Sequence, residues 1–184
     1  MAARTFVLFT LLAGLAVPAS ASVLVIGSNA ARSCYEAADS LALPLREDLA
    51  YCDTALTSEN LDTQDTVATY VNRGILRLRR GNVAEAIADF DQAIAIDPSQ
   101  PEAYLNKGAA LMRQDDARQA LGLFTMALDH NTRRPELAHY GRGIANESLG
   151  QVEQAYADYR RASELSPNWR EPQIELQRFR VVQR

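Results

Sequence analysis

The sequence predicts an all-α fold, a solenoid of stacked helical hairpins closed by a C-terminal capping helix. The main observation is a block that recurs along the second half of the 184-residue chain. Its glycines, Gly74, Gly108 and Gly143, lie 34 and then 35 residues apart. An alanine follows each glycine after 12 residues, an aromatic residue after 16 and another alanine after 19. A fixed period of this length indicates helical hairpins that stack side by side, an architecture that commonly binds other proteins.

Residues 1–21 are predicted to form a secretory signal peptide. Arg4 supplies a positive charge, residues 6–17 form an apolar run, and small residues occupy the cleavage positions 19–21. The apolar run is shorter than the ~20 residues that span a bilayer. We therefore expect cleavage after Ala21 and a periplasmic or secreted protein that is not inserted in the membrane. An uncleaved anchor is the alternative.

The next part of the chain has a looser pattern. Residues 22–28 begin with a β-prone run that ends at a glycine, which predicts an extended N-terminal arm. Residues 29–66 are predicted to form a degenerate first repeat and a linker. Its helices are expected over 31–40 and 46–56, and its polar linker over 58–66.

The chain has two cysteines, Cys34 and Cys52, and both follow the predicted cleavage site. An even pair in an exported protein predicts a disulfide. The two predicted helices of the first repeat carry one cysteine each, so antiparallel packing would bring them together. No histidine lies close enough in sequence to complete a zinc site, and we expect neither a metal nor a cofactor.

Residues 67–168 are predicted to form three regular repeats. Ile87, Phe90 and Ile94 recur at a helical period and predict a helix with one apolar face. The small residues of the block allow the two helices of a hairpin to approach closely, and the aromatic residues fill the space beside them.

The turns of these repeats have their own signals. Gly81 and Gly150 lie where the two helices of a hairpin meet and can adopt positive φ, and Asp115 has the same place in the middle repeat. Pro98 and Pro167 end second helices, because proline disfavours helix at the residue before it. Residues 169–184 then predict an amphipathic capping helix.

These positions resemble the tetratricopeptide repeat (TPR) family, whose pattern runs aromatic, small, aromatic, Ala, aromatic, Ala, Pro. The chain is also similar to small exported TPR proteins of proteobacteria. Three residues depart from the pattern: Arg77 and Asn146 replace an aromatic residue, and Thr132 replaces the proline. The residues that match are Tyr70, Gly74, Ala86, Phe90, Ala93 and Pro98, then Tyr104, Gly108, Ala120, Phe124 and Ala127, then His139, Gly143, Ala155, Tyr159, Ala162 and Pro167.

The resemblance implies that the first helices of successive repeats line a concave groove that holds a peptide or a partner helix. Asn72 and Asn106 occupy equivalent groove positions, and a carboxamide both donates to and accepts from a peptide backbone. Arg79 and Arg113 are also equivalent and suit a carboxylate. Tyr140 faces the groove in the third repeat. The alternative is that the asparagines only join one helix to another.

Other functions are disfavoured. The formal net charge of −4 argues against a nucleic-acid partner, which selects a basic face. His130 and His139 have no serine or cysteine partner in the repeat pattern, and the glycines are explained by packing and turns, so we expect no enzyme.

The sequence therefore predicts a noncatalytic module that binds a protein or peptide partner in the groove. The alternative is a structural or self-assembling subunit whose groove is filled by its own neighbour or by its own N-terminal arm. The acidic residues of segment 31–66 and the arginines of segment 160–184 also allow weak head-to-tail self-association, and the alternative is that both are ordinary solvated surface.

Overall fold

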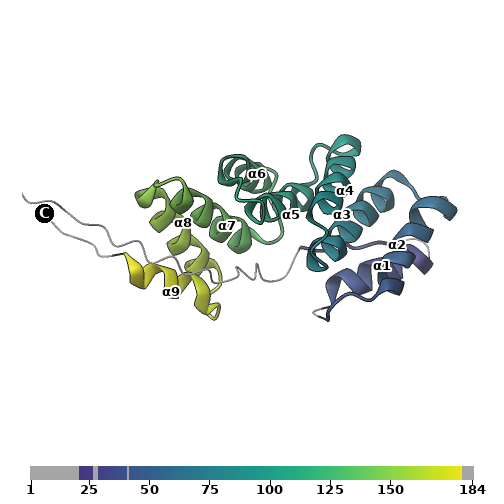
Figure 1. The fold of residues 1–184 in the computed structure, drawn as a ribbon, viewed down its shortest axis with the longest axis horizontal. Helices are drawn as coiled ribbons and strands as arrows, with labels where there is room; N and C mark the ends of the chain where they lie inside the picture. The colour runs from purple at the N-terminus through teal and green to yellow at the C-terminus, as the bar shows by residue number, and fades with distance from the viewer. Residues whose placement is uncertain (1–20, 27–28, 41, 180–184) are drawn as a thin grey trace, which may run out of the picture.

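The computed structural model describes residues 21–26, 29–40 and 42–179 (Figure 1). Apart from Ala21, the predicted signal peptide lies outside these residues. The described chain is all-α, as predicted, and contains nine helices. They are α1 Asn29–Asp39, α2 Arg46–Ser58, α3 Thr63–Arg79, α4 Val83–Ile96, α5 Pro101–Met112, α6 Ala117–Asp129, α7 Pro135–Ser148, α8 Val152–Leu165 and α9 Arg170–Arg178.

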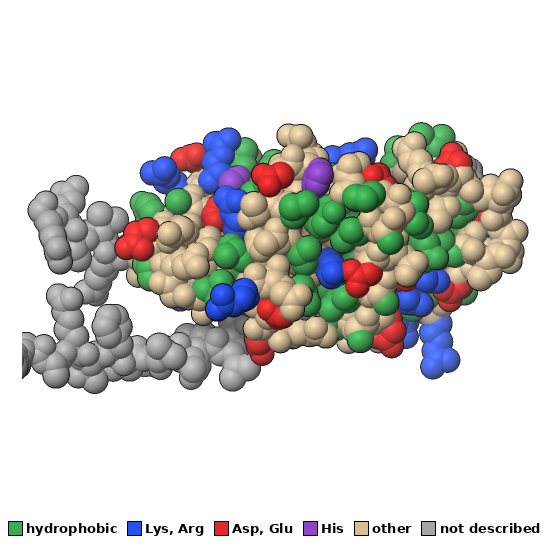
Figure 2. Space-filling view, turned by 90° about the horizontal axis from the view of Figure 1, so that it is seen from above, with side chains coloured by type: hydrophobic (Ala, Val, Ile, Leu, Met, Phe, Trp, Pro, Cys, Tyr) green, Lys and Arg blue, Asp and Glu red, His purple; other side chains and the backbone are tan. Residues whose placement is uncertain are grey.

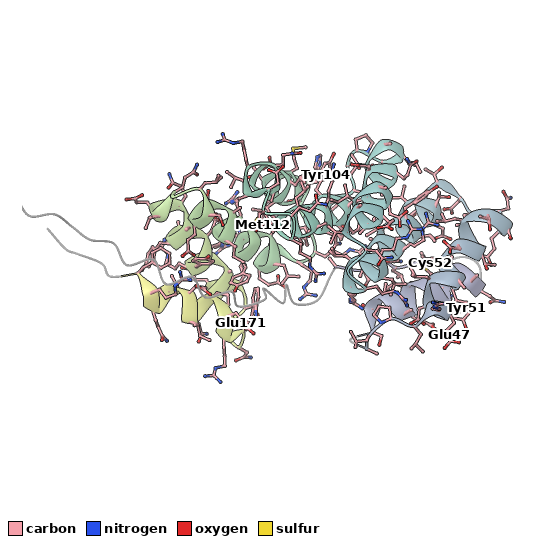
Figure 3. All side chains as sticks on the ribbon, viewed as in Figure 1. Glu47, Tyr51, Cys52, Tyr104, Met112 and Glu171 are labelled. Carbon is pink, nitrogen blue, oxygen red and sulfur yellow. A yellow bond between two sulfur atoms is a disulfide. The ribbon has the colours of Figure 1, made fainter. Side chains whose placement is uncertain are left out.

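The first eight helices form four hairpins, each made of two helices that are consecutive in the chain. The first helices of the hairpins also contact one another, α1 with α3, α3 with α5, and α5 with α7. The hairpins therefore lie in a row, and α9 packs on α8 at its end (Figure 1). Figure 3 shows Cys52 in the first hairpin and Glu171 on α9 at opposite ends of this row.

The close approach of the two helices in a hairpin depends on the repeated glycine and the repeated aromatic ring. A Cβ atom placed on Gly74 would lie 2.5 Å from Cε1 of Phe90. In the next hairpin, a Cβ on Gly108 would lie 2.9 Å from Cε1 of Phe124. The aromatic ring thus packs directly on the glycine backbone, so a larger residue there would force the ring to move.

The turns inside the hairpins follow the prediction. Gly81 has φ +85°, Gly150 has φ +74°, and Asp115 adopts φ 59° without being a glycine. Asn131, at the connection between α6 and α7, adopts φ 59° as well. There the N–H of Thr132 donates to the carbonyl of Ala127 at 2.9 Å, which closes a helix C-cap around a left-handed residue. The connection at Thr132, where the repeat spacing is 35 residues in place of 34, is therefore an ordered cap and not a proline stop.

The bounds of the polar linker and of the capping helix differ from the prediction. The polar linker expected over 58–66 is shorter, because the Asp62 carboxylate accepts the N–H of Asp65 at 2.7 Å and caps α3, which begins at Thr63. The capping helix expected over 169–184 ends at Arg178, and residues 180–184 lie outside the described part.

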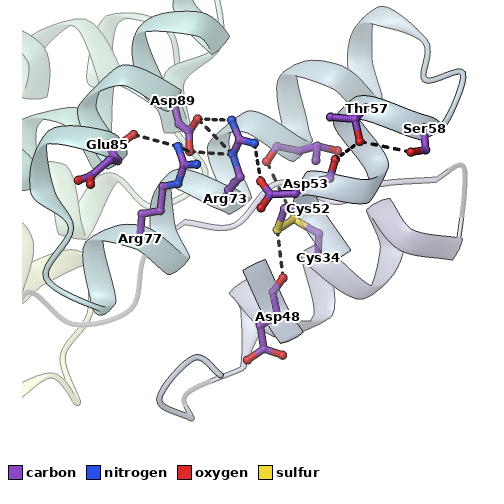
Figure 4. A network of polar contacts seen from close by, with 11 residues as sticks. Cys34, Asp48, Cys52, Asp53, Thr57, Ser58, Arg73, Arg77, Glu85 and Asp89 are labelled. Carbon is purple, nitrogen blue, oxygen red and sulfur yellow. Dashed lines mark hydrogen bonds and ion pairs between the residues drawn. A yellow bond between two sulfur atoms is a disulfide. The ribbon is translucent and has the colours of Figure 1, made fainter. Parts of the chain in front are cut away.

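The predicted disulfide is confirmed. Cys34 on α1 and Cys52 on α2 are bonded, and both side chains are fully buried (Figure 4). The bond ties together the two helices of the first hairpin, which has no outer neighbour among the described helices.

Within the described residues, no helix combines the length and the apolar character that crossing a bilayer requires.

Candidate peptide-binding face

The first helices of the hairpins carry an extended segment, residues 21–26, which we call the arm. Its side chains alternate as they do in a β-strand. Ala21, Val23 and Val25 are buried, with Val25 only 1% exposed, whereas Leu24 and Ile26 are 47% and 70% exposed. One face of the arm is therefore packed on the helices and the other faces outward.

The backbone of the arm is held by the Asn72 carboxamide on α3. The N–H of Val23 donates to Oδ1 of Asn72 at 2.9 Å, and Nδ2 of Asn72 donates to the carbonyl of Val23 at 2.8 Å. Both residues are buried, so this one side chain satisfies two main-chain groups that are shielded from water. Asn72 acts towards the arm as a neighbouring β-strand would.

Asn106, the equivalent residue on α5, also contacts the arm. Its Nδ2 donates to the carbonyl of Ala21 at 3.2 Å and to the carbonyl of Glu102 in its own helix at 2.8 Å. Two asparagines that are 34 residues apart in the sequence therefore bond main-chain groups of one extended segment.

Two carboxylates complete the polar contacts that the structure gives to the arm. Oδ1 of Asp65 accepts the N–H of Ile26 at 3.2 Å, and Oδ1 of Asp39 accepts the Ser22 hydroxyl at 2.7 Å. Sequence analysis did not identify either aspartate. Asp65 lies seven residues before Asn72 and therefore on the same face of α3. This spacing could have predicted that Asp65 faces the groove together with Asn72.

The two predicted groove arginines bond main-chain carbonyls of the preceding hairpin. Arg79 donates to the carbonyl of Ser40 at 2.5 Å, just after α1. Arg113 donates to the carbonyl of Leu78 at 2.6 Å, near the end of α3. The last carbonyls of a helix have no partner within it, so a cation from the next repeat both satisfies and electrostatically favours that end.

Tyr140, the fifth predicted groove residue, lies under the C-terminal helix. Its ring contacts Trp169 edge-on, with ring centroids 4.7 Å apart, and only 6% of the residue is exposed. Burial raises the pKa of Tyr140 to about 12, and the carboxylates of Glu175 and Glu171 add to this effect. The structure thus places Tyr140 in the contact between the third regular repeat and its cap.

A polar cluster that sequence analysis missed lies inside the second hairpin. The buried carboxylate of Asp89 on α4 accepts from Arg73 at 2.7 Å and from Arg77 at 2.8 Å, both on α3 (Figure 4). Arg73 also pairs with Asp53 of α2 at 2.7 Å and so links the first two hairpins. Arg77, which stands at an aromatic position of the family pattern, is thus an ion-pair partner of this carboxylate.

The fourth hairpin repeats the arrangement around Asp158 on α8. Its carboxylate accepts from Arg142 at 2.8 Å and from Asn146 at 3.0 Å, and it pairs with His139 at 2.9 Å. Burial alone would raise the pKa of Asp158, but the hydrogen bonds from His139 and Arg142 outweigh it and hold the pKa below its ordinary value. These clusters stabilise hairpins, which accounts for His139 without a catalytic role.

The face that Figure 2 shows carries no large patch of one charge. Acidic, basic and apolar side chains are interspersed over that face, and no single sign of charge dominates it.

The fold and the face define a class, the α-solenoid of helical hairpins that carries an extended segment on its first helices. A family model described as "TPR repeat" matches residues 64–115, and one described as "Tetratricopeptide repeat" matches residues 105–168. The chain is a tetratricopeptide repeat protein, and domains of this family are noncatalytic modules for protein–protein interaction.

Known proteins are similar over parts of the chain. A stretch of 55 residues is 42% identical to the Protein SGT1 homolog of Oryza sativa subsp. japonica. It covers 30% of this chain and 15% of the rice protein, so the match spans a small part of that relative.

Solved structures give longer matches. The first TPR of Spaghetti (RPAP3), bound to the HSP90 peptide SRMEEVD, is 29% identical with a TM-score of 0.59, over 64% of this chain and 91% of that one. MamA from Desulfovibrio magneticus RS-1 is 22% identical with a TM-score of 0.61, over 71% of each chain. At that identity, the likeness to MamA is evidence for the fold alone.

Proposed function

We propose that this chain binds an extended segment of a partner protein on the face of α3 and α5, through the carboxamides of Asn72 and Asn106. The observation that carries the proposal is the pair of hydrogen bonds between Asn72 and Val23. Both bonds go to main-chain groups, which every non-proline residue of a partner also has. The arm therefore serves as an example of how an extended ligand would be held.

The family supports this proposal. The first TPR of Spaghetti, 29% identical to this chain, was solved with a peptide bound. That structure supports a peptide as the class of ligand for this chain.

A second function is favoured by the burial of the arm. Val23 and Val25 belong to the same apolar core cluster as the disulfide-bonded Cys34 and Cys52. An arm packed this way suits a structural or self-assembling subunit in which the chain's own segment fills the face permanently. The two proposals differ in whether the arm leaves its place when a partner binds.

The test uses the full disulfide-bonded chain and a partner isolated with it, measured by calorimetry. Asn106→Ala should weaken binding by about 5- to 150-fold, the equivalent of the roughly 1–3 kcal/mol lost with a buried hydrogen-bonding group. Arg118→Ala is the matched control, because Arg118 is exposed on α6, a second helix. Equal affinities for the two variants would mean that Asn106 is not part of the binding surface.

We also propose that the chain is exported and cleaved after Ala21. The disulfide between Cys34 and Cys52 supports this, because such bonds persist in oxidising compartments. Cleavage there would remove the Ala21 carbonyl from Asn106 and leave that carboxamide for a partner. The intact mass of the protein recovered from the periplasm or medium tests it, and a mass that retains residues 1–21 would refute it.

A further inference from the structure

The buried face of the arm limits which side chains can occupy the binding face. Ala21 packs in a cluster with Tyr104 and Leu105, and Val23 and Val25 pack in the cluster that contains Val71 and Ile75 of α3. These sites are apolar and closely filled. A charged side chain at a buried position would lose its water without gaining a partner, and a much larger one would overfill the site.

The outward face sets no such limit. Leu24 and Ile26 are 47% and 70% exposed, so polar side chains at these positions would remain in water. The face therefore discriminates only at every second residue of an extended ligand, as the alternation of an extended chain requires.

The charges around the arm select against acidic ligands. The arm has no ionisable side chain, and the side chains that bond it are two carboxamides and the carboxylates of Asp39 and Asp65. The arginines predicted for the groove, Arg79 and Arg113, donate to main-chain carbonyls. An acidic segment would meet a like charge at Asp65, and it would also meet the Asp39 carboxylate, whose charge the nearby Arg79 guanidinium offsets only in part.

From these contacts we infer that the partner segment is an extended, neutral or basic stretch with small or β-branched apolar side chains at every second position. It takes the place of the arm, whose sequence Ala-Ser-Val-Leu-Val-Ile is its template. This inference rests on the proposed function and names the ligand chemistry of the same face. It separates this chain from a relative bound to SRMEEVD, a peptide with three acidic residues.

Competition with the arm has a measurable consequence. A ligand binds only the fraction of molecules whose arm has left, so its apparent affinity is reduced by that fraction. Weakening the arm from its buried face should therefore strengthen binding of an added peptide, whereas the same change on the exposed face should not.

The experiment uses fluorescence polarisation with a labelled, acetylated and amidated peptide of sequence Ala-Ser-Val-Leu-Val-Ile. The full disulfide-bonded chain is compared with Val23→Asp, which places a charge on the buried face, and with Leu24→Asp, which places it on the exposed face. We expect the peptide to bind the Val23→Asp chain at least about tenfold more tightly than the other two.

Ligand chemistry is tested on the Val23→Asp chain with three further peptides. Aspartate at the peptide's first valine should weaken binding by more than about tenfold, and aspartate at its leucine should leave affinity within about threefold. SRMEEVD should bind more weakly than the template peptide. If SRMEEVD or the peptide with aspartate at the first valine binds as well as the template, the inferred chemistry is wrong while the binding face stands. If a folded Val23→Asp chain binds none of them, the proposed function itself fails.

A second measurement needs no substitution, in case Val23→Asp does not fold. Hydrogen exchange is followed on the wild-type chain with an excess of each peptide. The template peptide should speed exchange of the Val23 and Ile26 amides, whose bonds to Asn72 and Asp65 are lost when the arm leaves. The peptide with aspartate at the first valine should not. Unchanged exchange with the template peptide would overturn the inference.

Discussion

Replacing Asn72 with alanine tests the arm more directly than any other single change. The substitution removes both hydrogen bonds to Val23, at 2.9 and 2.8 Å. Alanine is a good helix former, so the helical conformation of α3 itself is not weakened. Asn72 is fully buried, so solvent cannot replace the lost partners while the arm stays in place. The chain must then either keep two unsatisfied main-chain groups or release the arm.

The two outcomes have similar costs. Keeping the arm leaves a buried N–H and a buried carbonyl without partners, at about 1–3 kcal/mol each. Releasing it exposes Val23 and Val25, whose burial is worth roughly 1.5–3 kcal/mol each, and returns some chain entropy that lowers this cost. We therefore expect Asn72→Ala to lower the free energy of unfolding by about 2–4 kcal/mol.

Urea unfolding followed by circular dichroism measures that loss, and hydrogen exchange at residues 22–26 shows which outcome occurred. Asn106→Ala is the comparison, because it removes one longer bond to Ala21, or none in a chain cleaved after Ala21, and should cost less in either case. An unfolding free energy for Asn72→Ala within about 0.5 kcal/mol of wild type, the range of ordinary surface changes, would refute the role of Asn72.

Three further predictions concern the scaffold. Converting Cys34 and Cys52 to serine should destabilise the chain by roughly 3 kcal/mol, since the disulfide closes a loop with a sequence separation of 18. If the double variant unfolds at the same denaturant midpoint as the wild-type chain, this prediction is wrong. Because its folded pKa lies below the ordinary 3.8, Asp158 contributes stability that is present above that pH and lost as the pH falls through the folded pKa. Asp158→Asn should accordingly flatten the loss of unfolding free energy between neutral and acidic pH, and an unchanged slope would argue against the cluster. Ala120→Leu should overfill the fully buried space in the third hairpin and cost roughly 1–3 kcal/mol, which thermal unfolding would detect.

Local patterns in the sequence were enough to predict the hairpins. The glycine and aromatic positions, the left-handed turns and the helix ends depend on residues that are close in the chain or repeat at a fixed period. Gly81, Gly150 and Asp115 therefore adopt positive φ where the pattern placed them. The disulfide was predictable for a different reason: the chain has only two cysteines, so no pairing had to be chosen.

The departures from the repeat pattern could be recognised in the sequence but not explained from it. Arg77 and Asn146 stood out as polar residues at aromatic positions. Their partners, Asp89 and Asp158, are 12 residues away on the second helix of the same hairpin. Only the packing of that hairpin shows that each pair meets and is buried.

The segment that lies on the face of α3 and α5 was decided by tertiary structure. An extended arm and two groove asparagines were each predictable, yet 49 residues separate Val23 from Asn72 and 85 separate Ala21 from Asn106. No local preference determines which residue of an extended segment meets which side chain over such distances. The same holds for Arg79, Arg113 and Tyr140. Their helix positions were predictable, but the carbonyls and the ring that they contact belong to neighbouring elements, whose placement depends on how the hairpins stack.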